Sequence, residues 1–253
     1  MIYFVGFTGL TGLAGLAYLR YYEYSKINRE VEQLMESNEI RQHLYETSQQ
    51  QSFSIDSLMD DFEGKYNKSS ISNYRQTLAS LAAGKVLETC AGSNRNLRFY
   101  KAGLDLTLLD YSPNMVSVGS TKTSPLLNYK YELGDVMAMP FADDSYDCVV
   151  DTFGLEYVLN PHQALQEMRR VCRKDGRILL MNEGLSNILE FHYFENMKWG
   201  ENLIRGGYFS NRNWEKLVKA FDFEVEHEER KKNGKLYIYV LRNRKEGRVV
   251  ETA

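Results

Sequence analysis

The globular part of the sequence alternates short apolar runs with helical patterns, from Lys85 to about Leu241. Between the runs, apolar residues recur every three or four positions, as over Pro161–Arg173, which predicts helices. An alternation of strands and helices predicts a mainly parallel sheet with helices on both faces. The five runs predicted to be its strands are Lys85–Thr89, Asp105–Asp110, Tyr129–Leu133, Tyr146–Asp151 and Arg177–Asn182.

The pattern changes near the end of the chain. Phe221–Glu228 and Lys235–Arg242 follow each other as two further strand-like runs, joined through Lys231-Lys232-Asn233-Gly234. Asn-Gly is a strong hairpin turn signal. We therefore expect the sheet to finish with an antiparallel hairpin, which is not the ordinary arrangement of a dinucleotide-binding domain.

The first residues of the chain are apolar. Ile2–Leu19 carries no charge over 18 residues, a length that just suffices to cross a hydrocarbon core of about 30 Å. Glycines recur every three positions from Gly6 to Gly15, which would let another membrane helix approach closely. The basic residues that follow, beginning with Arg20, place the rest of the chain on the cytosolic or matrix side.

Three other interpretations of this segment were weighed. A cleaved secretory signal would carry basic residues before the apolar run, and a mitochondrial presequence would be rich in arginine. A buried core helix would have to be rich in glycine and uncapped. We expect an uncleaved transmembrane anchor over 1–20, a helical linker over 21–63, a catalytic domain over 64–245 and a tail over 246–253.

Composition excludes several classes of function. A net charge of −3, with basic runs that are short and interspersed with acids, leaves no electrostatic footprint for nucleic acid. The three cysteines, Cys90, Cys148 and Cys172, form no CxxC pair, and the four histidines are scattered. We therefore predict neither a disulfide framework nor a metal site.

Polar residues follow four of the predicted strands. In sheets of this kind ligands bind at the carboxyl ends of the strands. Asp110 comes 22 positions after Glu88, about where a carboxylate can accept both hydroxyls of a ribose. A single acid at a strand end can simply cap the next helix. Glu88, Asp110, Asp135 and Asp151 stand in order at four such ends, and together they indicate a nucleoside site.

On these residues the chain resembles the class I methyltransferases that use S-adenosylmethionine. Within that family it is similar to the group that includes the ubiquinone/menaquinone C-methyltransferases and the membrane-anchored methyltransferase-like proteins. The resemblance covers roughly Tyr66–Arg242. Its motifs are Val86–Asn96, Leu108–Ser112, Gly134–Phe141, Ser145–Val150 and Ala164–Gly176.

The resemblance implies a role for each motif. Glu88 would reach the amino group of the cofactor, the loop after it would wrap the methionine part, and Asp110 would hold the ribose. Tyr111 would flank the adenine, and Asp135 would take its amino group. The residues expected to bind S-adenosylmethionine are thus Glu88, Gly92, Ser93, Asp110, Tyr111, Asp135, Val136, Thr152 and, closing the site, Tyr66.

The loop departs from the family pattern. The family places glycine at alternate positions, whereas here Gly92 alone remains, with Cys90 before it and Asn94 after it. Asn adopts left-handed backbone more readily than most residues, so Asn94 can keep the course of the loop. Cys90 adds a Cβ facing the cofactor. We predict that the loop is altered but competent.

The substrate side is less determined. Candidate bases stand after the fourth and fifth strands, and none has a partner that the sequence assigns: Glu156, Tyr157, His162, Glu183, His192 and Tyr193. The aromatic-rich segment Leu185–Phe209 is either an apolar lid for a lipid or quinone ring, or a segment that packs on the sheet.

Two functions from different classes follow. The first is a membrane-anchored S-adenosylmethionine-dependent methyltransferase acting on a lipophilic small molecule or a membrane-associated protein. The second is a catalytically reduced subunit with a structural role in a mitochondrial membrane complex, where other transmembrane helices would contact Ile2–Leu19. A nicotinamide oxidoreductase is disfavoured because GxGxxG is missing. We expect the mitochondrial inner membrane with the domain in the matrix, or else the endoplasmic reticulum membrane.

Overall fold

The computed structural model describes residues 2–37, 39, 43, 46, 70–122, 124 and 127–245. Of residues 2–17, 70, 190, 191, 194, 195, 205 and 206 it describes the backbone alone. The expected tail over 246–253, most of the second half of the linker, and Tyr66 lie outside the described residues.

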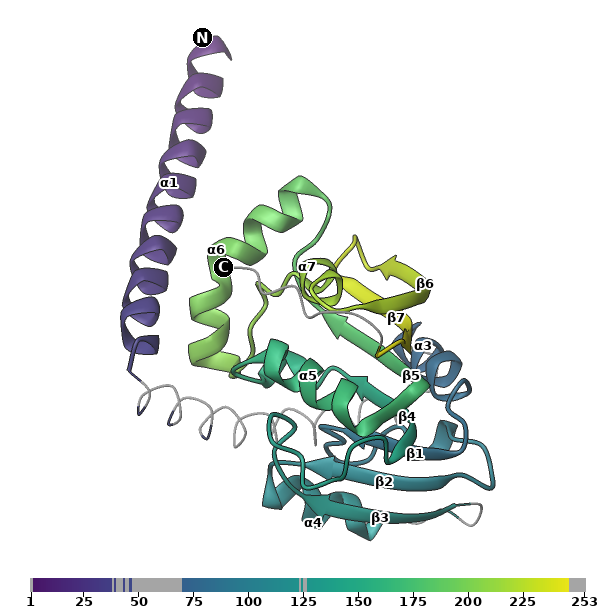
Figure 1. Ribbon diagram of the computed structural model, residues 1–253. Helices are drawn as coiled ribbons and strands as arrows, with labels where there is room; N and C mark the ends of the chain where they lie inside the picture. Colours follow the sequence, from purple (N-terminus) through teal and green to yellow (C-terminus); the bar gives the residue numbers. More distant parts are fainter. Residues whose placement is uncertain are drawn as a thin grey trace.

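A seven-stranded sheet forms the centre of the domain (Figure 1). Its strands are β1 (Lys85–Thr89), β2 (Asp105–Asp110), β3 (Asn128–Leu133), β4 (Tyr146–Thr152), β5 (Cys172–Glu183), β6 (Phe223–Lys231) and β7 (Leu236–Asn243). They are ordered β3-β2-β1-β4-β5-β7-β6. The first five pair in parallel, and β7 pairs antiparallel with both β5 and β6.

The architecture is the Rossmann-like α/β sheet that the sequence predicts, including its antiparallel end. Lys232, Asn233 and Gly234 all have positive φ, between 49° and 76°, so the Asn-Gly turn closes the hairpin as expected. The strand β5 begins five residues earlier than Arg177, because Cys172 already pairs with Tyr146 before the register shifts. The hairpin inserts β7, not β6, beside β5.

Helices cover both faces of the sheet. In the described part of the domain these are α3 (Ser70–Ala79), α4 (Pro113–Thr121), α5 (Pro161–Val171), α6 (Leu189–Gly206) and α7 (Trp214–Lys219), with short 3-10 turns η1 (Leu97–Phe99) and η2 (Leu155–Tyr157). The starts of α4 and α5 are specified locally. Each has proline in its first turn, and the preceding Ser112 or Asn160 side chain accepts a backbone N–H bond from that turn.

Successive strand residues enter opposite halves of the core. Leu87 and Val149 pack with α5 and α7, whereas their neighbours Val86 and Val150 pack with α3. A strand buried on both faces reads as a continuous apolar run, which is why the sequence pattern located β1 and β4. Together these layers hold the carboxyl ends of β1, β2 and β4 side by side.

The helix α1 (Ile2–Met35) runs without a break through residue 20, where we expected the anchor to end. Its second half packs on α6, and Val31 joins Leu203 and Phe209 in a small apolar cluster. In Figure 1, α6 stands between α1 and the sheet. Within the part of the chain that the structure describes, no helix is long and apolar enough to cross a membrane. The structure thus gives a helix over this segment without identifying it as a membrane span.

Candidate functional site

The loop after β1 keeps left-handed backbone at all three positions where the family pattern has glycine. The φ angles are 48° at Cys90, 58° at Gly92 and 66° at Asn94. Non-glycine residues rarely adopt this region, because the Cβ approaches the backbone carbonyl. The loop therefore follows the course that its glycines would have set, despite the two replacements.

Space for Cys90 comes from a glycine on the neighbouring strand end. A Cβ built on Gly154 would lie 2.1 Å from the Cβ of Cys90 and 2.7 Å from Oδ1 of Asp151. Phe153, just before it, also has positive φ, at 61°. The turn after β4 is thus shaped around Cys90, which the sequence alone did not indicate.

Asp110 ties the loop to the end of β2. Its Oδ2 accepts a 2.8 Å hydrogen bond from the backbone N–H of Gly92, and its Oδ1 accepts one of 2.9 Å from Ser112 N–H. The hydroxyl of Tyr131 on β3 donates to the Gly92 carbonyl from another side. Each carboxylate oxygen has two lone pairs, so Asp110 retains acceptor capacity for a ligand hydroxyl.

Three carboxylates surround the thiol of Cys90. Burial, followed by the charges of Asp151, Asp110 and Asp135, raises the pKa of Cys90 well above its ordinary value. Burial also raises the pKa of Asp135, whose Oδ1 accepts a 2.8 Å bond from Met137 N–H. The ends of β2, β3 and β4 therefore bring these acids together beside the loop, with a neutral thiol among them.

Glu88 turns into a buried polar network at the end of β1. Its two oxygens accept hydrogen bonds from Asn96 Nδ2 and Tyr100 Oη, both at 2.8 Å. Burial raises the pKa of Glu88 to about 7, against the Tyr100 hydrogen bond and the positive charge of Arg75, which lower it. At neutral pH this carboxyl is thus close to half-protonated.

Thr152 belongs to the same network. Its Oγ1 accepts bonds from Arg75 at 2.7 Å and from Asn96 at 2.9 Å, and the Arg75 guanidinium also lies 4.9 Å from the centre of the Phe153 ring. Sequence reasoning assigned Thr152 to the cofactor but missed Arg75. No motif contains Arg75, and a lone arginine in a helical pattern gives no signal of a contact 77 positions away.

The other expected cofactor residues lie around this edge in different degrees of burial. Ser93 and Val136 are buried, and Tyr111 is half-buried. Tyr66 lies outside the described residues, so its position stays a prediction. Nothing in the structure contradicts the assigned set, but its binding role also stays a prediction.

The candidate bases are differently placed. Glu156 is buried, and burial together with the carboxylate of Glu183 raises the pKa of Glu156 well above its ordinary value. Its Oε1 accepts a hydrogen bond from Glu183 N–H. A carboxyl held neutral in this way cannot serve as the resting base.

The remaining candidates make contacts that the sequence did not predict. The His162 ring lies 4.7 Å from that of Phe221, and Tyr157 lies 6.0 Å from Tyr208. Nδ1 of His192 lies 3.0 Å from the Ser186 carbonyl oxygen.

Asp151 is the most deeply buried acid of the edge. It is bonded to Asn182 Nδ2 at 3.0 Å, Thr89 Oγ1 at 3.3 Å and Leu155 N–H at 3.3 Å. Burial raises the pKa of Asp151 to about 6 despite these bonds, which lower it. At neutral pH its charge is largely present and faces the loop.

The edge is suited to a cationic nucleoside. Asp110, Asp135 and Asp151 place negative charge at the loop, which favours a ligand with positive charge. The carboxamide of Asn94 is 2% exposed and makes no hydrogen bond to the described residues, so it has unused donor and acceptor capacity in the loop itself. Acceptors for hydroxyls and amines, with negative charge for a sulfonium, match the groups of S-adenosylmethionine.

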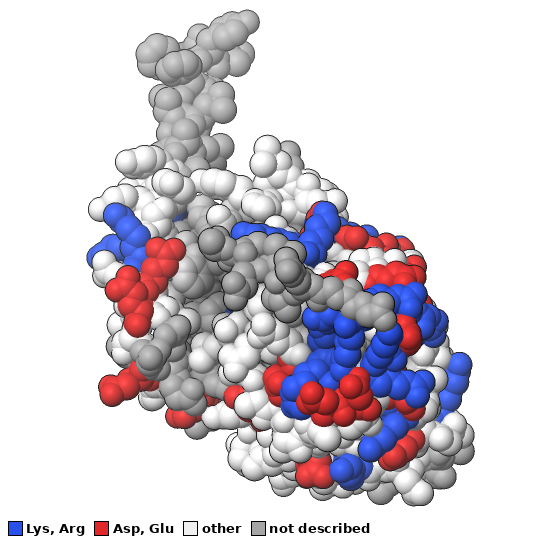
Figure 2. All heavy atoms as spheres, viewed as in Figure 1, with Lys and Arg blue, Asp and Glu red and all other residues white. Residues whose placement is uncertain are grey.

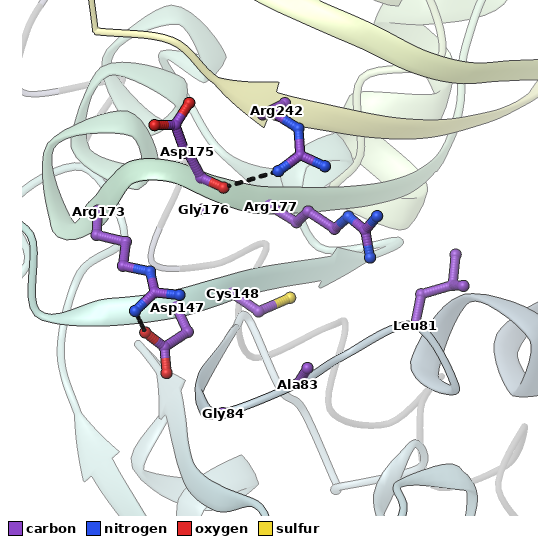
Figure 3. Close-up of a pocket in the computed structure, with 10 residues that line it drawn as sticks. All are labelled: Leu81, Ala83, Gly84, Asp147, Cys148, Arg173, Asp175, Gly176, Arg177 and Arg242. Atoms are coloured by element: carbon purple, nitrogen blue, oxygen red, sulfur yellow. Dashed lines mark hydrogen bonds and ion pairs between the residues drawn. The ribbon is translucent and has the colours of Figure 1, made fainter.

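A second hollow of about 340 Å³ lies at the opposite, amino edge of the sheet (Figure 3). Its arginines are engaged by the protein itself: Arg173 pairs with Asp147, and Arg242 donates to the Asp175 carbonyl at 3.1 Å. Ligands of parallel sheets bind at the carboxyl edge, so this hollow is not part of the candidate site.

Known proteins support the same edge. A family model described as "Methyltransferase domain" matches residues 87–180. The demethylmenaquinone methyltransferase of Renibacterium salmoninarum is 38% identical over 97 residues, which are 38% of this chain and 40% of that protein. The enzyme of the same name from Staphylococcus aureus strain JH9 is 37% identical over 101 residues, 38% of this chain and 42% of that protein.

Solved structures share the fold. A SAM-dependent methyltransferase from Methanosarcina mazei superimposes with a TM-score of 0.54 at 16% identity, covering 63% of this chain and 92% of that one. An S-adenosylmethionine-dependent methyltransferase from Mesorhizobium loti gives 0.55 at 13% identity, covering 70% and 99%. These likenesses establish the class I methyltransferase fold.

The matched segment spans about two fifths of the curated relatives' length. Within it lie the loop, Asp110, Asp135 and Asp151. Residues 87–180 are therefore a methyltransferase domain, and S-adenosylmethionine is the cofactor that this domain takes.

Proposed function

We propose that this protein is an S-adenosylmethionine-dependent methyltransferase, anchored to a membrane, that methylates a lipophilic small molecule. The observation that carries the proposal is the loop after β1. Cys90, Gly92 and Asn94 all keep left-handed backbone, with Asp110 and Asp135 beside them. A loop that had lost its ligand would have no reason to hold two non-glycine residues in a costly conformation.

The roles we assign follow from the acceptors at each strand end. Asp110 would accept the ribose hydroxyls while it holds Gly92 and Ser112, and Asp135 would accept from the adenine amino group. Tyr111 and Val136 would flank the adenine ring. Glu88, positioned by Asn96 and Tyr100, would act on the amino group of the cofactor through its negative charge.

When bound, S-adenosylmethionine supplies a methyl group on a positively charged sulfur, ready for displacement by a nucleophile. The protein's own contribution is alignment and exclusion of water, which can lower the barrier by as much as roughly 7–11 kcal/mol. A carbon or oxygen nucleophile also needs its proton removed. Of the candidate bases, Glu183 and His192 stand nearest in sequence to the end of β5, beyond the carboxyls that burial keeps neutral.

The class of substrate is suggested by the relatives. Two of the relatives described above are demethylmenaquinone methyltransferases, whose printed name indicates a lipophilic quinone. In this chain the aromatic-rich segment after β5 supplies an apolar neighbourhood for such a ring. A membrane-associated protein is the other substrate class that we keep for testing.

The membrane part of the proposal depends on the sequence of Ile2–Leu19, which has no charge, and on its continuity with a 34-residue helix. The segment would hold the enzyme at the mitochondrial inner membrane with the domain in the matrix, or at the endoplasmic reticulum membrane. Its glycines would accommodate other transmembrane helices of a larger complex. Fractionation of cells that express the tagged chain, followed by protease protection, distinguishes the two membranes.

Binding of the cofactor is the direct test. The full chain, purified in detergent, should melt at a higher temperature with S-adenosylmethionine or its demethylated product, by an amount that grows with the logarithm of concentration above Kd. An unchanged melting temperature at saturating cofactor would refute the enzyme, and would favour the structural subunit of a membrane complex.

A further inference from the structure

The helices α1 and α6 lie side by side and run in the same direction. Asn28 contacts Gly200, 172 positions later in the chain. Tyr21 stacks on Tyr193 with ring centres 6.3 Å apart, and Val31 shares an apolar cluster with Leu203. The separation in sequence is the same for all three pairs, so the two helices advance in parallel and in register.

This register fixes which residues stand at the same height. By the common separation, Ile188 and Leu189 at the start of α6 are level with positions 16 and 17 of α1. The uncharged stretch of α1 ends at Leu19, and Arg20 is the first charged residue. The start of α6 therefore lies about one helical turn inside the height at which the uncharged stretch ends.

Large apolar side chains are exposed at this height on both helices. Leu189 is 79% exposed, Tyr193 51% and Tyr18 67%. Leu19 and Tyr22 are exposed as well. Figure 2 shows uncharged surface around the point where α1 leaves the domain, whereas lysines, arginines and acids gather on the part of this face away from it.

We propose that the first turns of α6, Ile188–Tyr193, lie in the interface of the same bilayer that holds Ile2–Leu19. This inference rests on the proposed membrane anchor. The contact would place a second, non-spanning element of the chain at the lipid surface. Together the two elements would set the orientation of the whole domain, because two separate contacts fix an angle that a single helix leaves open.

The composition of the surface favours lipid as its occupant. Tyrosines are typical of the membrane–water interface, where the ring is apolar and the hydroxyl is hydrated. Tyr18, Tyr21, Tyr22 and Tyr193 form such a group around two aliphatic side chains. Glu190 is the one charged residue from Leu185 to Phe194, and a carboxylate in the first turn of a helix is favoured by the helix dipole.

The contact would also connect the bilayer to the candidate site. α6 follows the carboxyl end of β5 after five residues. At its other end, Phe209 N–H donates a 2.9 Å bond to the Glu156 carbonyl, in the turn after β4. A lipophilic substrate leaving the bilayer beside α6 would thus reach the edge that carries Asp151 without crossing water.

Quenching by brominated lipid tests the proposal on the full chain. Tryptophan is introduced by Leu189→Trp, and the matched control is Ile204→Trp, an equally apolar site of the same helix that is 52% exposed. Position 204 is level with residue 32 of α1, roughly 22 Å farther from the bilayer at 1.5 Å per residue. Both variants are reconstituted into phosphatidylcholine vesicles with and without bromine on the acyl chains.

The emission added by Leu189→Trp should fall roughly twofold in brominated vesicles, as for an apolar face buried in the interface, and that of Ile204→Trp should not change. Equal quenching at both sites, or none at either in protein that floats with the vesicles, overturns the inference. Shielding of the Leu189→Trp side chain from acrylamide without quenching by bromine would mean a protein partner, and also overturns it. A chain that does not float with vesicles refutes the anchor, and S-adenosylmethionine binding separately tests the enzyme.

Discussion

The backbone N–H of Gly200 in α6 donates a 3.0 Å hydrogen bond to Oδ1 of Asn28 in α1. Nδ2 of the same side chain donates to the Met197 carbonyl at 3.0 Å and to the Asn196 carbonyl at 3.5 Å. One carboxamide thus bonds to both donors and acceptors along a turn of another helix. Figure 1 shows α6 bending along its length, and side chains that bond to a helix's own ladder are a known cause of bends.

Asn28→Ala should loosen α1 from the domain, because it leaves these α6 groups without their partner. We expect a loss of about 1–3 kcal/mol, as for removal of one partner from a buried polar contact. Hydrogen exchange of the α1 amides from Tyr21 to Met35 should then speed up by roughly tenfold or more. Gly200→Ala should act in the same way, since its Cβ would stand 2.7 Å from Asn28 Oδ1. Glu23→Ala, at an exposed position of α1, is the control and should leave exchange unchanged.

Cys90→Gly should be tolerated or stabilising. Relief of positive φ is worth about 1 kcal/mol and offsets the packing that the thiol loses. The same change at Cys148, fully buried in β4, should cost about 2 kcal/mol or more, because it leaves a cavity in a strand. Urea denaturation of the two variants measures the difference. A larger loss at Cys90 than at Cys148 would contradict the argument from backbone conformation.

Gly154→Ala should destabilise the protein by about 1–3 kcal/mol, through overlap of the new Cβ with Cys90. In a Cys90→Gly background the same change should cost less, since the 2.1 Å contact with Cβ of Cys90 is removed. The contact with Asp151 Oδ1 at 2.7 Å remains, so rescue should be incomplete. A double-mutant cycle gives the coupling, and additive effects would show that the two residues do not meet.

Asp110→Asn should weaken S-adenosylmethionine binding at least tenfold, about 1.4 kcal/mol, measured by calorimetry. An amide offers one acceptor oxygen in place of two, so it cannot accept from Gly92 and Ser112 as Asp110 does and also serve a ligand. Asp105→Asn makes the same change at the exposed start of the same strand and is the matched control. Equal affinities for the two variants would remove Asp110 from the site.

Stability should fall as pH rises through the range in which Glu88 ionises. Burial raises the pKa of Glu88 from 4.5 to about 7, so between these values the folded protein binds more protons than the unfolded chain. The free energy of unfolding then decreases with pH, by on the order of 3 kcal/mol for this group. Asp151, whose pKa burial raises to about 6, adds a change of the same sign at lower pH.

Glu88→Gln isolates the contribution of that residue. Its free energy of unfolding should decline less steeply than that of the parent between pH 5 and pH 8, because the amide does not titrate. Denaturation by urea at several pH values gives the two curves. Parallel curves would mean that Glu88 keeps an ordinary pKa in the folded protein.

Much of the fold could be predicted from local sequence pattern. The bounds of β1 and β2 came directly from apolar runs, and the Asn233-Gly234 turn announced the hairpin. These features depend on residues within a few positions of one another, where backbone preference and side-chain periodicity act. The carboxylates at successive strand ends were predictable for the same reason, since parallel strands bring their carboxyl ends to one edge.

Contacts between distant segments had no such signal. Arg75 meets Thr152 across 77 positions, and Asn28 meets Gly200 across 172. Nor did the sequence show that Glu88 would turn toward Asn96 and Tyr100, because the orientation of a buried acid depends on which donors the rest of the core supplies.

By itself, then, the sequence determined the order of strands and helices, the turn chemistry and the edge at which a nucleoside would bind. Tertiary structure decided that Cys90 and Asn94 hold the left-handed course of a glycine loop, that β7 enters beside β5, and that α1 and α6 run in register. Each of these depends on packing between segments far apart in the chain. Such packing selects among conformations that local preferences leave nearly equal in free energy.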